Sequence, residues 1–96
     1  MEKSAADVAA ATKNYRAALE RVLGIYEREL ARRAEQVELR RDLYERGVLK
    51  KQEFDEGLRA HADARKNVED TRRAIEDTDR LLRETEEAEA LARRPK

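Results

Sequence analysis

Residues that break helices are nearly absent from this chain, and their positions restrict its fold more than any other feature. Among 96 residues there is one proline, Pro95, and there are three glycines, Gly24, Gly47 and Gly57. Alanine, glutamate, arginine and leucine dominate the remainder, which is typical of long helices and coiled coils. The sequence predicts a single all-α domain with a helix over about 4–46, a turn over about 47–50 and a helix over about 51–93.

Gly47 divides the chain almost in half and predicts the turn of a helical hairpin. Glycine favours the left-handed backbone conformation with which many helices end. Val48 and Leu49 come next, and we consider two roles for them. They either fold back on Tyr44 and Phe54 as an apolar plug, or they form an exposed knob at the tip. At the outer ends, Ser4 is expected to cap the first helix and Pro95 to stop the second.

Seven-residue spacing predicts which faces of the two helices meet. In the second half, large residues recur at Phe54, His61, Val68, Ile75 and Leu82. Small residues fill the complementary positions, namely Gly57, Ala64, Thr71, Thr78, Thr85 and Ala92. The first half shows two phases, one through Val8, Tyr15 and Val22 and the other through Leu30, Val37 and Tyr44, which predicts a local change in the supercoil.

Folding the chain at Gly47 brings these faces together. Residues whose numbers add up to about 98 then lie opposite each other, for example Tyr44 with Phe54 and Tyr15 with Leu82. The sequence therefore predicts a long antiparallel two-helix coiled-coil hairpin. Acidic residues four places before basic ones, such as Asp79 before Arg83, predict ion pairs within each helix.

The first helix has more apolar surface than a two-helix hairpin can bury. The predicted self-association residues are Leu19, Leu23, Ile25, Tyr26 and Leu30. We expect a second copy of the chain to cover them in a homo-oligomer, with a dimer that forms a four-helix assembly favoured. A helix end of the same chain or a neighbouring domain is the alternative, and parallel and antiparallel association both remain open.

Nothing in the sequence predicts catalysis or a bound cofactor. The chain has one histidine, His61, no cysteine, no glycine-rich phosphate loop and no Ser/His/Asp arrangement, so we expect no enzyme, no metal site and no cofactor. The 22 basic and 22 acidic residues cancel, and acidic residues interrupt every basic run, so nucleic acid is not an expected partner. No apolar run is long enough for membrane insertion.

The stretch from Leu43 to Asp55, LYERGVLKKQEFD, with long heptad helices on both sides, resembles the tip of the α-helical hairpin in periplasmic adaptor (membrane fusion) proteins of tripartite efflux systems. In that family the tip points at an outer-membrane channel. Leu43 matches the second leucine of the family's Arg-Leu-x-x-Leu docking pattern, whereas Leu39 and Arg40 stand in place of Arg-Leu and Lys50 in place of its serine. The resemblance implies a periplasmic location if an export signal has been removed, and without such a signal we expect the cytoplasm.

The same stretch is also similar to the short SHOCT-type oligomerisation module. The matching residues are Leu39, Leu43, Gly47, Val48, Leu49, Glu53, Phe54 and Leu58. Together these observations predict a non-catalytic hairpin for protein–protein interaction or assembly, with an adaptor-like envelope role as the favoured context. The expected partner-binding tip consists of Leu43, Tyr44, Val48, Leu49 and Lys50. The rival hypothesis is a stand-alone dimeric coiled-coil scaffold or regulatory protein in the cytoplasm.

Overall fold

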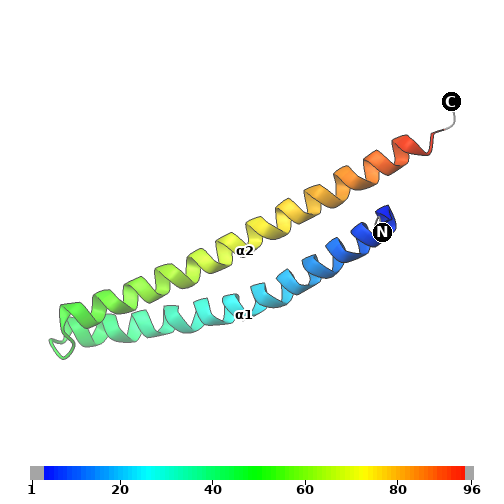
Figure 1. The fold of residues 1–96 in the computed structure, drawn as a ribbon. Helices are drawn as coiled ribbons and strands as arrows, with labels where there is room; N and C mark the ends of the chain where they lie inside the picture. The colour runs from blue at the N-terminus through cyan, green and yellow to red at the C-terminus, as the bar shows by residue number, and fades with distance from the viewer. Residues whose placement is uncertain (1–3, 95–96) are drawn as a thin grey trace.

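The computed structural model describes residues 4–94 and contains two long helices joined by a tight turn. Helix α1 spans Ala5–Glu45 and helix α2 spans Lys51–Ala92. The helices lie side by side in opposite directions, with the turn at one end and both chain ends at the other (Figure 1). The molecule is a rod of 76 × 24 × 17 Å. The predicted all-α hairpin is confirmed, and residues 4–94 include no strand.

Of the two residues predicted at the outer helix ends, Ser4 lies within the described residues. The Ser4 hydroxyl oxygen accepts a hydrogen bond from the backbone N–H of Asp7 at 3.2 Å, so Ser4 caps α1 as predicted. Lys50 occupies the N-cap position of α2 and makes no side-chain capping bond. The predicted stop at Pro95 lies outside the described residues, and α2 ends three residues earlier, at Ala92.

Gly47 ends α1 in the left-handed conformation that the sequence predicts, with φ +76°. Its backbone N–H donates to the Tyr44 carbonyl at 3.0 Å, and the N–H of Val48 donates to the Leu43 carbonyl at 2.9 Å. These two bonds form the Schellman motif, which satisfies carbonyls that the end of a helix would otherwise leave unpaired. The turn is therefore built from backbone hydrogen bonds around one glycine.

The contact line between the helices, which we call the seam, is narrow and partly polar. The buried residues are Val37 of α1 and, from α2, Gly57, Ala64, Val68, Thr71 and Thr78. The spacing predicted for α2 is thereby confirmed along most of its length, although Ala92 is exposed. The hydroxyls of Thr71 and Thr78 each donate to the carbonyl four residues earlier, at 2.7 Å, so these polar side chains are satisfied within their own helix.

On α1 the predicted change of phase is wrong. One uninterrupted row of residues faces α2, comprising Ala9, Thr12, Arg16, Leu19, Leu23, Tyr26, Leu30, Arg33, Val37, Arg40 and Tyr44. Val8 and Tyr15 lie beside this row and are 45% and 56% exposed, so Tyr15 does not fill the seam opposite Leu82. The prediction followed the apolar residues of α1. Near the N-terminus, however, small or polar residues occupy the seam, and the apolar residues Val8 and Tyr15 lie in the neighbouring row.

Near the turn the register follows the prediction. The rings of Tyr44 and Phe54 stack with centroids 5.1 Å apart and planes inclined by 4°. Arg40 crosses over Gly57 and donates to the Glu53 carbonyl at 2.8 Å. A β-carbon at position 57 would lie 2.8 Å from the Arg40 Cδ atom, so the missing side chain of Gly57 makes room for this crossing. Aromatic stacking and the arginine together fix the tip half of the hairpin.

Two glycine-to-alanine substitutions should change stability in opposite directions. We expect Gly47→Ala to lower the free energy of unfolding by about 1 kcal/mol or more, because alanine is strained at positive φ. Gly24→Ala should raise it by up to about 1 kcal/mol, because Gly24 lies inside α1 and an added β-carbon meets nothing closer than 3.6 Å. Urea unfolding followed by circular dichroism measures both. Stabilisation by Gly47→Ala would contradict the left-handed turn.

Candidate interaction surfaces

One long side of the hairpin is closed by ion pairs between the helices. The guanidinium of Arg16 donates to both carboxylate oxygens of Asp79, one of them at 3.3 Å. Further towards the turn, Arg72 Nη2 lies 3.5 Å from Glu27 Oε1. We call this side the ion-pair flank. The spacing predicted that Asp79 would pair with Arg83 in its own helix. Asp79 instead bonds across the seam to Arg16.

The Arg16 guanidinium perturbs the titration of Asp79. Its hydrogen bonds lower the pKa of the Asp79 carboxyl below the usual range, an effect that partial burial opposes and the nearby Arg83 charge reinforces. The pKa of Arg16 is raised above its usual range, first by the hydrogen bond to Asp79 and then by the one to Glu20. Both shifts indicate that the pair is formed between charged groups, so protonation of Asp79 should weaken it.

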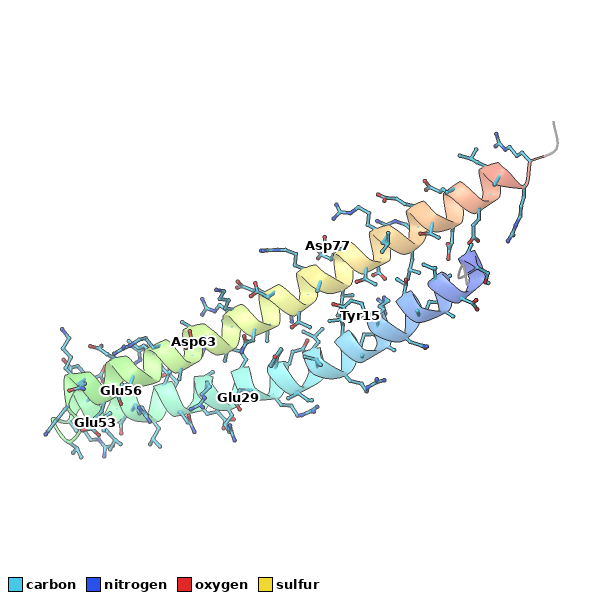
Figure 2. All side chains as sticks on the ribbon, in the orientation of Figure 1. Tyr15, Glu29, Glu53, Glu56, Asp63 and Asp77 are labelled. Atoms are coloured by element: carbon cyan, nitrogen blue, oxygen red, sulfur yellow. The ribbon has the colours of Figure 1, made fainter. Side chains whose placement is uncertain are left out.

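The opposite long side has two grooves, and over residues 4–94 no ion pair joins the two helices there. Towards the chain ends, a groove of about 350 Å³ is lined by Val8, Ala11, Thr12, Tyr15, Thr78 and Leu81. Figure 2 shows Tyr15 on the side of α1 that faces α2. Closer to the middle of the rod, a second groove of about 320 Å³ is lined by Ile25, Tyr26, Arg28, Glu29 and Arg32 of α1 and by Asn67 of α2. Both helices therefore contribute to an open surface that is apolar towards the chain ends and partly charged near the middle.

On α2 this surface continues as a row without charge. The row takes every seventh residue and consists of Ala60, Asn67, Ala74, Leu81 and Ala88. In a coiled coil, residues seven apart lie along one line of the helix. We define the apolar flank as Val8, Tyr15, Val22 and Ile25 of α1 with Ala74, Leu81 and Ala88 of α2. It covers the half of the hairpin that is further from the turn, which we call the open half.

The structure places the predicted self-association residues in two locations. Leu19, Leu23, Tyr26 and Leu30 belong to the seam and are half-buried between the helices. Ile25 is 56% exposed and lies on the apolar flank. A Leu23→Glu change would consequently disturb the hairpin itself, whereas a change at Ile25 probes the outer surface. Sequence reasoning missed Val8 and Tyr15 as flank residues because their spacing also fits a seam, and it did not single out Leu81.

The tip residues are likewise divided between exposed and partly covered positions. Val48 is 70% exposed and Tyr44 is 38% exposed, and Lys50 is exposed as well. Leu43 and Leu49 are half-buried. The exposure of Val48 agrees with the knob rather than with the plug. Leu39, which is 61% exposed, was not among the predicted tip residues, although it appeared in the oligomerisation-module pattern.

The protein exposes far more surface than a compact chain of its size. Its accessible surface is 7768 Å². A compact monomer of 11.2 kDa exposes about 5,700 Å². The excess of about 2,000 Å² is larger than the roughly 800 Å² that one partner contributes to a standard protein–protein interface. The excess reflects the thin, elongated shape of the hairpin, in which few side chains are fully buried.

Other kinds of site find little support in residues 4–94. No group of three or more His, Asp or Glu side chains is arranged to hold a metal ion among these residues. His61 is half-buried in the seam. Neither helix, over the part described, is long and apolar enough to cross a membrane. Comparisons with protein-family models, curated proteins and solved structures find no match to this chain.

The ion pair across the seam should contribute to stability only while Asp79 is ionised. Because the folded-state pKa of Asp79 is lowered, this contribution is present above the carboxyl's unfolded pKa of about 4 and is lost as the pH falls through the folded value. Asp79→Asn should lower the melting temperature at about pH 7 and have a much smaller effect at about pH 2. Glu38→Gln is the control, because Glu38 pairs with Arg41 inside α1. Equal effects of the two changes at about pH 7 would refute a special role for Asp79.

Proposed function

We propose that this protein is a non-catalytic helical hairpin that presents its tip to a protein partner. The observation that carries the proposal is the 70% exposure of Val48 in the hydrogen-bonded turn. A hairpin that needed Val48 only to close its turn would gain stability by burying it, since apolar burial is favourable. With Leu39 and Tyr44 nearby in sequence on the last turns of α1, Val48 forms an apolar and basic surface completed by Lys50.

The favoured context is an adaptor-like role in an envelope transport system. Two features support this context: the turn sequence from Leu43 to Asp55 and the length of the rod, 76 Å. A long hairpin with a defined tip suits a part that reaches towards another assembly and inserts between its helices. The departures at Leu39, Arg40 and Lys50 from the adaptor docking pattern mean that the partner's recognition chemistry would differ from that pattern.

A stand-alone dimeric scaffold in the cytoplasm is the second candidate function. The observation in its favour is that large apolar side chains are exposed along the rod and not only at its tip, for example Tyr15, Ile25 and Leu81. Such a scaffold would form a four-helix assembly and would have no specific use for the tip. The two functions therefore differ in whether substitutions at the tip affect the binding of another protein.

Replacing exposed apolar residues at the tip tests the first proposal. We expect the double variant Leu39→Ser, Val48→Ser to lose a binding partner that the wild-type chain captures from the source cells, with an unchanged melting temperature because both side chains are mostly exposed. Quantitative mass spectrometry of the captured proteins measures the loss. The cell fraction that contains the partner separates an envelope role from a cytoplasmic one.

Leu91→Ser provides the matched control. Leu91 is 63% exposed, as the tip residues are, but it lies at the other end of the rod. The control should keep the partner. Capture that survives the tip substitutions, or that is lost equally in the control, would argue against the tip and in favour of the scaffold.

A further inference from the structure

Charged residues border the apolar flank, with opposite signs on the two helices. On α2 an acidic row takes every seventh residue and consists of Glu56, Asp63, Asp70, Asp77 and Glu84. All five are exposed, and Figure 2 shows Asp77 on the side of α2 away from α1. Asp70 and Asp77 stand four residues before Ala74 and Leu81, so they adjoin the uncharged row directly.

On α1 the corresponding border is basic. Arg21 and Arg28 stand four residues before and three residues after Ile25, so both adjoin it on the helix surface. Glu29 adjoins Ile25 as well, but its carboxylate is paired with Arg32 and Arg33 inside α1. Arg21 and Arg28 are both exposed. The interhelical pairs of the ion-pair flank set the register, which places Arg21 at about the level of Asp77 and Arg28 at about the level of Asp70. Over residues 4–94 no ion pair links these arginines to these aspartates within the hairpin, and Asp77 pairs with Arg80 of its own helix.

Two symmetric arrangements would place the apolar flanks of two copies face to face. If the two-fold axis runs across the rod, α1 of one copy lies on α1 of the other and α2 lies on α2. The acidic row of one copy then meets the acidic row of the other. A two-fold axis along the rod puts α1 of one copy on α2 of the other and leaves every residue at its own level. Arg21 then meets Asp77 of the second copy, and Arg28 meets Asp70. Only the second arrangement is complementary in charge.

We propose that a second copy of this chain covers the apolar flank, with the two-fold axis along the rod and both tips at the same end. The proposal rests on the self-association that the sequence predicts, and it adds the surface and the orientation. The side of the rod that bears the flank measures about 76 by 24 Å, so its open half alone is comparable with the roughly 800 Å² that one partner buries in a standard interface. The net charge of zero places no overall repulsion between copies.

The same charge pattern limits the contact to the open half of the rod. Nearer the tip, Glu35 and Asp42 continue the border of α1 and would oppose Asp63 and Glu56 of the second copy. Like charges at these levels hold the tip halves apart. Two tips at one end of the assembly are therefore left free, which agrees with tips that bind another protein.

Exchanging the two border charges tests both the surface and the orientation. Arg21→Asp and Asp77→Arg should each raise the dissociation constant of the dimer roughly tenfold, because each change introduces repulsion at two symmetry-related contacts. The double variant Arg21→Asp, Asp77→Arg should recover most of the wild-type affinity. Analytical ultracentrifugation over a concentration series measures the constants, and circular dichroism verifies that each variant is helical.

Glu76→Arg is the matched control. It reverses an acidic charge one residue earlier on α2, about 100° around the helix and away from the apolar flank, and should leave the constant unchanged. A monomeric wild-type chain would overturn both this proposal and the self-association on which it rests. A dimer as insensitive to the border changes as to Glu76→Arg would overturn the surface alone. A dimer weakened by both single changes but not rescued by the double would overturn the orientation.

Discussion

The seam between α1 and α2 is the interaction on which the whole molecule depends, and it is thin. Among residues 4–94 the buried apolar side chains are only Val37, Ala64 and Val68. Apolar burial contributes about 25 cal/mol per Å², so a seam of small residues holds two helices together weakly for their length. The Schellman turn and the Tyr44–Phe54 stack keep the helices joined at one end. Towards the other end the seam relies increasingly on polar contacts.

Along the open half of the rod, that polar seam determines which surfaces stay free. Arg16 occupies a seam position that an apolar residue would fill in a regular coiled coil, and it binds Asp79. Tyr15 is left beside the seam, where it lines an apolar groove with Leu81. Ion pairs thus join the two helices along one flank, whereas the other flank has an open apolar groove. This asymmetry is the reason why the proposed second copy is placed on the apolar flank.

The sequence predicted those features that depend on one residue or on a regular period. Gly47 indicated its own left-handed turn, and the seven-residue spacing of α2 identified Ala64, Val68 and Thr71 correctly. The path of the seam along α1 was not predictable from hydrophobicity, because Arg16 occupies it through an ion pair that requires the position of Asp79 on the other helix. The exposure of Val48 also needed the folded turn, since either packing of that side chain suits the same sequence.

The distance between the tips of two copies tests the central claim most directly, namely that the free flank of the hairpin is covered by a second copy lying in the same direction. The chain has no cysteine, so Val48→Cys gives one spin label per copy at an exposed site. Pulsed electron spin resonance should find the labels separated by a distance comparable to the 24 Å width of the rod. A separation approaching or exceeding its 76 Å length, or no defined distance between copies, would contradict the account.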